Sequence, residues 1–150
     1  MRNSLSSASI TENLETHLIG KRVIYYPSLI STMEVAKRET QEGAAEGTVI
    51  IADEQTAGKG RLKRTWLSPR GNIALSIILY PSVGYLPSLI MLASLAVVYS
   101  IETVTGLKLQ LKWPNDVLIN GRKLCGILIE SDVRESRVGY AIIGIGINVN

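Results

Sequence analysis

Residues 116–149 read DVLINGRKLCGILIESDVRESRVGYAIIGIGINV, and this stretch describes three strands of one sheet. Asn120-Gly121 separates two apolar runs, and an Asn-Gly pair supplies the two residues of positive φ that a type I′ turn requires. We therefore expect a hairpin in which residues 116–119 precede the turn and residues 123–131 follow it. Residues 138–149 are rich in isoleucine and valine, which predicts a further buried strand.

The pattern upstream adds strands and helices in mixed order. Ser31-Thr32-Met33-Glu34 has the form of a capping box and predicts a helix that ends near Glu42. A long apolar helix is expected over residues 87–105, with Gly106 just past its end. Further strands are expected at residues 21–26, 47–54, 72–80 and 107–113. Strands mixed with helices in this way predict an α+β (α/β) domain, with a mixed or mostly antiparallel sheet and flanking helices.

Length and composition favour one globular domain. The chain has 150 residues, of which 46% are apolar and 19% charged. A domain of this size buries roughly 70% of its unfolded surface, so a core can form without disulfides or a structural metal. Cys125 is the single cysteine and His17 the single histidine, which excludes an internal disulfide and a Cys/His metal site. We expect a buried structural thiol, a surface histidine and a reducing, cytoplasmic setting.

Residues 71–101 contain no charged residue, so a membrane-spanning helix has to be considered. The run is interrupted by Pro81 and Pro87, and fourteen residues remain between Pro87 and Glu102. That is fewer than the ~20 residues that a span needs. We expect a buried core helix here and no membrane partner. The first sixteen residues lack the apolar core of a secretory signal and predict a polar lead-in or a short helix.

The net charge of +3 is concentrated in one short segment. Residues 58–70 hold five cations and no acid, so the rest of the chain carries −2; the five are Lys59, Arg61, Lys63, Arg64 and Arg70. Two glycines in this segment allow the backbone to approach a ligand, and arginine binds phosphate or carboxylate with two parallel hydrogen bonds. We expect a loop between two strands that encloses an anion. The spacing matches neither a P-loop nor a dinucleotide fingerprint, and the alternative is a solvated turn.

Two other clusters carry polar groups at the ends of strands. Lys112, next to the Trp113-Pro114 turn, can neutralise a carboxylate or a developing phosphorane charge, or it can be a solvated lysine at the end of a strand. Asp116 in the same cluster can help to hold a metal ion. Gly144 and Gly146 lie within a buried strand, which indicates close approach of a ligand or of another backbone, or else a bulge or tight packing.

The order and spacing of five motifs resemble those of the biotin protein ligases, also called biotin–acetyl-CoA-carboxylase ligases. The resemblance extends from Val23 to Asn150. The family's motifs are matched in order by Ser31-Thr32, by QTAGKGRLKRTW at 55–66, by KWPND at 112–116, by KLCGILIE at 123–130 and by GIGINVN at 144–150.

This resemblance implies a catalytic core like that of class II aminoacyl-tRNA synthetases. It also implies a two-step reaction in which biotin and MgATP give biotinyl-5′-AMP and pyrophosphate, after which a lysine of a biotin carboxyl carrier protein takes the biotin. The implied cofactors are biotin as substrate, ATP and Mg²⁺. The implied partner is the carrier protein, with a homodimer allowed and no nucleic acid expected.

The resemblance also implies roles for individual residues. Arg61 and Lys112 would be catalytic, with Lys112 near the biotin carboxylate and the α-phosphate and Arg61 holding both substrates. Contacts to biotin would come from Ser31, Thr32, Met33, Gln55, Gly58, Lys59, Gly60, Arg61, Lys112, Gly126, Gly144 and Gly146. Contacts to ATP would come from Arg61, Arg64, Trp66, Asn115, Asp116 and Asn148, with Asp116 also a ligand of the metal.

The sequence departs from the family pattern in several places. Lys59 stands where the family often has Arg, Lys63 where Gly or Asn is common, and Met33 where Asn often follows Ser-Thr. We expect residues 1–20 to be a polar lead-in and residues 21–150 to be a partial catalytic domain. The winged-helix domain of some members and the C-terminal SH3-like barrel are expected to be absent.

Other functions remain open at this point. A lipoate or octanoyl transferase would share the fold, although the two motifs at 58–66 and 112–116 are typical of the biotin branch. A non-catalytic biotin-binding fragment or ligand sensor is a second alternative. A nucleic-acid-binding module is a third, but five cations in one segment match one small anion better than a row of phosphates.

Overall fold

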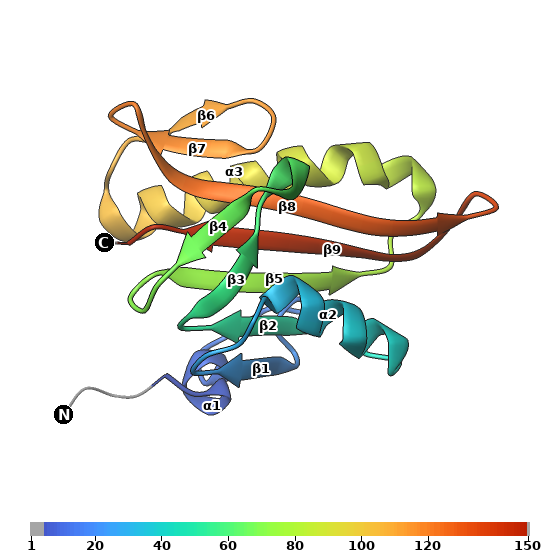
Figure 1. The fold of residues 1–150 in the computed structure, drawn as a ribbon. Helices are drawn as coiled ribbons and strands as arrows, with labels where there is room; N and C mark the ends of the chain where they lie inside the picture. Colours follow the sequence, from blue (N-terminus) through green and yellow to red (C-terminus); the bar gives the residue numbers. More distant parts are fainter. Residues whose placement is uncertain (1–4, 150) are drawn as a thin grey trace.

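The computed structural model describes residues 5–149 of the chain. Its helices and strands alternate irregularly along the sequence, as Figure 1 shows. In chain order the elements are α1 (Ser7–Thr11), β1 (Val23–Tyr26), α2 (Thr32–Gln41), β2 (Val49–Ala52), β3 (Gln55–Lys59), η1 (Arg61–Lys63), β4 (Thr65–Ser68), β5 (Ile73–Leu79), η2 (Val83–Tyr85), α3 (Leu86–Thr105), β6 (Gln110–Lys112), β7 (Asp116–Ile119), β8 (Arg122–Arg134) and β9 (Arg137–Ile147).

Seven of the strands form one mixed sheet in the order β1-β2-β5-β9-β8-β7-β6. Strand β1 is parallel to β2, and the other neighbours are antiparallel. The parallel pair follows from the crossover through α2, which returns the chain to the same end of the sheet. The predicted α+β class with a mixed sheet and flanking helices is confirmed.

The turn predicted at Asn120-Gly121 is present between β7 and β8. Asn120 has φ 49° and Gly121 has φ 75°, as a type I′ turn requires. The following strand, β8, continues to Arg134 and pairs along most of its length with β9. These two long strands run through the middle of the sheet (Figure 1). Their side chains contribute to both faces of the sheet.

Successive residues of β9 belong to two different hydrophobic clusters of the described residues, one on each face of the sheet. Ala141 and Ile143 belong to the cluster under α3, whereas Ile142 belongs to the cluster under α2. Because neighbouring side chains of a strand point to opposite faces, α2 and α3 cover opposite faces of the sheet (Figure 1). Each fully buried aliphatic side chain in these clusters stabilises the fold by about 1.5–3 kcal/mol.

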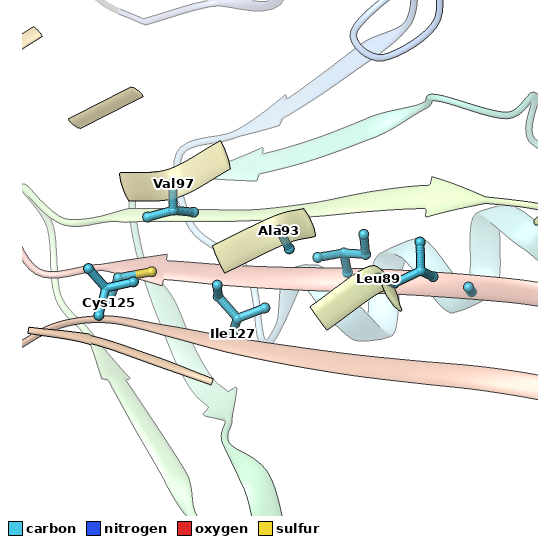
Figure 2. Close-up of a cluster of buried hydrophobic side chains, with 8 residues drawn as sticks. Leu89, Ala93, Val97, Cys125 and Ile127 are labelled. Carbon is cyan, nitrogen blue, oxygen red and sulfur yellow. The ribbon is translucent and has the colours of Figure 1, made fainter. Parts of the chain in front are cut away.

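Helix α3 has the predicted extent, but only one side of it is buried. Figure 2 shows Leu89, Ala93 and Val97, spaced four residues apart, directed toward Cys125 and Ile127 of β8. The opposite side is exposed, with Met91, Leu92, Leu95 and Tyr99 each at least half accessible to solvent. The expectation of a buried core helix was therefore wrong for half of its surface, because the sheet covers a single stripe of the helix.

The segment Val83–Thr105 is long and apolar enough to cross a membrane by length and composition alone. Within its most apolar window 22% of the residues are buried in the protein. The buried stripe packs on the sheet, and Gly106, with φ 72°, ends the helix by a bond from its N–H to the carbonyl of Glu102.

The basic segment forms a hairpin rather than the predicted loop. Strands β3 and β4 pair in a separate two-stranded sheet, with Gly58 opposite Trp66 and Lys59 opposite Thr65. The N–H of Gly60 donates to the carbonyl of Arg64 at 2.8 Å and closes the tip. These strands lack the apolar alternation that predicts a strand, so they could not be predicted from the sequence pattern. We call residues 55–68 the basic hairpin; it crosses the face of the sheet that carries α2 (Figure 1).

Candidate functional site

A small cavity lies where the basic hairpin crosses β8 and β9. Its volume is about 50 Å³, which is room for water molecules and well below the 300–1,000 Å³ of ordinary ligand pockets. An open groove of about 640 Å³ adjoins it and shares Lys59, Gly60, Arg61 and Leu128. The cavity is lined by Ser31, Thr32, Met33, Gln55, Lys59, Gly60, Arg61, Trp66, Asn115, Lys123, Gly126, Ile127, Leu128, Gly144, Ile145 and Gly146.

The floor of the cavity is a glycine surface on the sheet. Gly126 and Gly146 are direct partners across β8 and β9, and the indole of Trp66 lies against both. A Cβ on Gly126 would lie 2.8 Å from Cζ3 of the indole, and a Cβ on Gly146 would lie 2.5 Å from Cε2. Gly144 similarly admits Met33, whose Sδ would lie 2.6 Å from a Cβ there. These glycines thus make room for side chains, as the tight-packing alternative predicted.

One end of the cavity is polar and is built at the start of α2. The backbone N–H and the hydroxyl of Thr32 both donate to Oε1 of Gln55, at 2.8 and 3.1 Å. Ser31 is fully buried and its Oγ has no hydrogen-bond partner among the described residues. An unpaired buried hydroxyl costs free energy, so its position at the cavity wall indicates a ligand group as its partner.

The predicted capping box at α2 is wrong, although the helix starts where expected. Ser31 is the N-cap residue by its extended backbone, but its side chain makes no capping hydrogen bond. Glu34 does not reach back to Ser31, because its carboxylate pairs with Nζ of Lys59 in the basic hairpin. Instead of capping the helix, Ser31 lines the cavity and Glu34 binds the basic hairpin through Lys59.

The other end of the cavity carries positive charge. Nη1 of Arg61 donates to Oδ1 of Asn115 at 2.9 Å, which ties the tip of the basic hairpin to the turn before β7. Lys123 extends along the cavity with its Nζ 5.2 Å from the centroid of the Trp66 ring and 2.8 Å from Oδ1 of Asp116. An ammonium over an indole face is a favourable cation–π arrangement.

Lys112, predicted as catalytic and biotin-binding, lies outside the cavity. It ends β6, the edge strand, and β7 separates it from β8 and β9. It lines a different groove beside α3, together with Met91, Leu95 and Trp113. The structure instead brings Lys123 to the cavity, in addition to the predicted Lys59. Lys123 belongs to the motif at 123–130 but was not assigned a role.

A β-bulge places Lys123 on the cavity face of the sheet. Strict alternation would place Lys123 on the same face as Cys125, under α3. Val117 pairs with Cys125 but Leu118 pairs with Lys123, so the register shifts between them. Because cross-strand partners share a face, this shift turns Lys123 to the face opposite Cys125, where the cavity lies.

Four further predicted residues do not line the cavity. Gly58 and Arg64 line the adjoining groove; Gly58 is required there because a Cβ would lie 2.5 Å from the carbonyl oxygen of Trp66. Asn148 is held by its neighbours, since its Nδ2 donates to the carbonyl of Lys123 at 3.3 Å and its Oδ1 accepts from Asn72 at 3.4 Å. Asp116 forms an ion pair with Lys123 and contributes to the lining of the groove beside α3 rather than to that of the cavity.

The metal prediction for Asp116 receives no support from neighbouring ligands. Among residues 5–149, no three His, Cys, Asp or Glu side chains lie together as a metal site would need. Cys125 is fully buried beneath the sheet, and desolvation raises the pKa of its thiol to about 12. It is therefore a structural thiol rather than a nucleophile, as predicted, and His17 is exposed as predicted.

The cavity thus combines three kinds of contact in one place. Hydroxyl and amide groups of Ser31, Thr32 and Gln55 can hydrogen-bond a polar ring, and Trp66 can pack against an apolar body. Arg61 and Lys123 can hold an anion. The chemistry of these groups suits a carboxylic acid with a polar head and an apolar chain, together with a phosphate, and the adjoining groove of about 640 Å³ supplies the volume that the cavity lacks.

Comparison with known sequences gives consistent results. The sequence profile of the biotin/lipoate A/B protein ligase family matches residues 25–148. The chain is 46% identical over 149 residues to the bifunctional ligase/repressor BirA of Bacillus subtilis, covering 97% of this chain and 46% of that protein. It is 40% identical over 111 residues to a biotin–[acetyl-CoA-carboxylase] ligase of Paracoccus denitrificans, covering 71% of this chain and 46% of that protein.

Solved structures show the same architecture. A biotin protein ligase from Aquifex aeolicus in complex with biotin and ATP superposes with a TM-score of 0.73 at 37% identity, covering 87% of this chain and 53% of that one. A biotin protein ligase from Leishmania major in complex with biotinyl-5-AMP gives a TM-score of 0.72 at 33% identity, covering 86% and 57%. The chain spans about half the length of the relatives that it matches.

Proposed function

Because this chain belongs to the biotin/lipoate A/B protein ligase family, we propose that it carries the catalytic site of an ATP-dependent biotin ligase. In the first step the biotin carboxylate attacks the α-phosphorus of ATP, giving biotinyl-5′-AMP and pyrophosphate. In the second step the amine of a lysine attacks the acyl carbon, giving the biotinyl amide and AMP. The acceptor that we propose is a biotin carboxyl carrier protein, and the setting is the cytoplasm.

One observation carries this proposal. The cavity has polar groups at one end, an apolar indole beside them and cationic side chains at the other end. The ureido ring of biotin offers a carbonyl acceptor and N–H donors, which suit the Gln55 amide and the unpaired Ser31 hydroxyl. The hydrocarbon body of biotin suits the indole of Trp66. The carboxylate then lies toward the cationic end, where Arg61 and Lys123 line the wall.

Arg61 and Lys123 are the residues that we propose to promote adenylation. Attack of a carboxylate on a phosphate brings two anions together, and positive charge held in place lowers the barrier to this step. Lys123 replaces Lys112 in this role because Lys123 lines the cavity, whereas Lys112 lines the groove beside α3. The pairing of Arg61 with Asn115 and of Lys123 with Asp116 fixes both cations before the substrates bind.

The nucleotide is expected to enter through the adjoining groove. Lys59, Gly60 and Arg61 of the basic hairpin line both that groove and the cavity. Lys63 and Arg64, which line the groove, form no ion pair with another described residue. Their charges are therefore free to meet phosphate oxygens. We propose that Mg²⁺ arrives as MgATP and is held mainly by phosphates, because among residues 5–149 Asp116 belongs to no group of three His, Cys, Asp or Glu side chains.

The test of this function is biotin-dependent release of pyrophosphate from ATP by the purified 150-residue chain, with biotin binding followed by isothermal titration calorimetry. We expect saturable biotin binding, displaced by biotinyl-5′-AMP, and pyrophosphate release that requires biotin. Binding without pyrophosphate release would instead indicate a biotin-binding fragment. Binding of lipoate in competition with biotin would indicate the lipoate branch of the family. Failure to bind biotin or its adenylate would overturn the proposal.

The oligomeric state that we propose is at most a homodimer. Light scattering coupled to size-exclusion chromatography distinguishes a 16.4-kDa monomer from a dimer, and addition of biotin and ATP shows whether ligands shift the equilibrium.

A further inference from the structure

Ser76 is a buried polar residue in the middle of β5, behind the wall of the cavity. It is fully buried, and its register partner in β9 is Gly144, one of the cavity glycines. Its hydroxyl donates to Oγ1 of Thr32 at 2.8 Å. A polar side chain in the core of a sheet costs free energy unless it is hydrogen-bonded, and here the single bond of its hydroxyl leads to a residue of the cavity.

The chain of hydrogen bonds continues from Thr32 to Gln55. The hydroxyl of Thr32 donates to Oε1 of Gln55, and the backbone N–H of Thr32 donates to the same atom. A backbone N–H can only donate, so the atom that faces Thr32 must be the amide oxygen and not the nitrogen. Both lone pairs of this oxygen are then occupied. Nε2 lies on the other side of the amide, close to Gly58, where a Cβ would be 2.8 Å away.

Ser76 determines which way the hydroxyl of Thr32 donates. Since the hydrogen of Ser76 fills a lone pair of Thr32 Oγ1, the hydrogen of Thr32 is directed to Gln55. Without Ser76 the Thr32 hydroxyl loses its donor and can rotate, leaving the amide oxygen of Gln55 held by one bond from the backbone. A linked series of hydrogen bonds in a low-dielectric interior strengthens each member.

We propose that Ser76 is a positioning residue for substrate recognition: through the hydroxyl of Thr32 it tightens the hold on the Gln55 amide, whose orientation the backbone N–H of Thr32 sets. The amide then presents its two N–H donors to an acceptor on the ligand. The proposal rests on the proposed function for the identity of that ligand, the cyclic urea carbonyl of biotin. The orientation of Gln55 itself is a property of the free protein.

The first measurement therefore needs no ligand. In ¹H–¹⁵N spectra of the chain, the side-chain amide signal of Gln55 is assigned by its loss in Gln55→Ala. We expect Ser76→Ala to shift this signal and to speed exchange of its hydrogens severalfold. Ser94→Ala is the matched control, because Ser94 is also buried but donates to the carbonyl of Ile90 within α3 on the opposite face. A merely structural role of Ser76 would leave the Gln55 side-chain signal in place.

The second measurement is a double-mutant cycle with biotin as the probe. Ser76→Ala is expected to weaken biotin binding by about three- to tenfold, the effect of one neutral hydrogen bond. In the Gln55→Ala background the same substitution is expected to have no further effect, because the group through which Ser76 acts is gone. Thermal unfolding of each variant and of Ser94→Ala separates loss of binding from loss of stability.

The outcomes separate the two proposals. If the wild-type chain binds no biotin, the proposed function fails, and the Gln55 signal still decides whether Ser76 tightens the hold on the amide. If biotin binds but Ser76→Ala leaves the Gln55 signal unchanged, the positioning role is overturned and the proposed function stands. Equal loss of affinity in both backgrounds also overturns the positioning role, since it shows an effect of Ser76 that does not pass through Gln55.

Discussion

Trp66 of the basic hairpin lies flat in the space that Gly146 of β9 leaves by having no side chain. A Cβ on Gly146 would lie 2.5 Å from Cε2 of the indole and 2.9 Å from Cζ2. The paired glycine of β8, Gly126, accommodates the far edge of the same ring. The position of the whole hairpin over the sheet therefore depends on the absence of a Cβ atom at Gly126 and at Gly146.

Gly146→Ala tests this dependence. A rigid ring cannot bend away as a lysine chain can, so the new methyl group has to displace the indole or the strand. We expect the free energy of unfolding to fall by about 1–3 kcal/mol, as for other overpacked sites. Biotin binding is expected to weaken at least tenfold because Trp66 forms one wall of the cavity. Urea denaturation and calorimetric titration measure the two effects.

Gly84→Ala is the matched control for this substitution. A Cβ on Gly84 would meet no atom within 4 Å, and the residue lies in η2, away from the cavity. We expect its stability and biotin affinity to match those of the wild type. Equal effects of the two alanine substitutions, or an unchanged affinity in Gly146→Ala, would contradict the packing of Trp66 described here.

Lys123→Met tests the assignment of the cationic residue. This substitution removes the ammonium from the cavity but keeps most of the chain that lies over Trp66. We expect biotin-dependent pyrophosphate release to fall by roughly 10²–10³, the usual cost of losing one charge that stabilises a transition state. Lys108→Met serves as the control, because that lysine is 90% exposed and lies away from the cavity. Lys112→Met is expected to have a much smaller effect than Lys123→Met, and the reverse order would restore Lys112 as the catalytic lysine.

The sequence predicted the architecture well because its local signals agree with the tertiary structure. The turn at Asn120-Gly121 and the end of α3 at Gly106 both depend on residues that accept positive φ, and both lie where expected. The five motifs, scattered over more than a hundred residues, contain all the residues that line the cavity except Met33. Polar residues at fixed spacing carry information about a site even when the strands between them are placed only approximately.

The remaining features depend on contacts that no local pattern encodes. The bulge between β7 and β8 turned Lys123 to the cavity face, and one extra residue in a strand cannot be read from alternation alone. Glu34 does not cap α2, because its carboxylate pairs with Lys59, which is 25 residues away in sequence. The hairpin strands β3 and β4 are stabilised by Trp66 on the glycine floor rather than by an apolar stripe of their own.

Leu62→Gly is expected to stabilise the tip of the basic hairpin. Leu62 and Lys63 have φ of 55° and 59°, a left-handed conformation that costs a non-glycine residue roughly 1 kcal/mol. Leu62 is also 83% exposed, so its side chain contributes little packing. Exchange of the Gly60 amide, which bonds to Arg64 across the tip, is expected to slow about fivefold. Leu67→Gly, at an exposed leucine in the extended strand β4, is expected to have the opposite effect.

Burial of Cys125 makes the stability of the fold depend on pH above about 9. Desolvation raises the pKa of the thiol from 9.0 to about 12, so the unfolded chain releases this proton at lower pH than the folded protein does. The stabilisation is complete below pH 9 and is lost between pH 9 and 12, at about 1.4 kcal/mol per pH unit. Cys125→Ala lacks this contribution but keeps every other titrating group, including Tyr25 and Tyr80, whose pKa values are also raised. Urea denaturation at pH 8 and pH 10 is expected to show the wild type losing about 1 kcal/mol more than Cys125→Ala. Parallel pH dependence of the two proteins would show that the thiol ionises as readily in the folded state as in the unfolded chain.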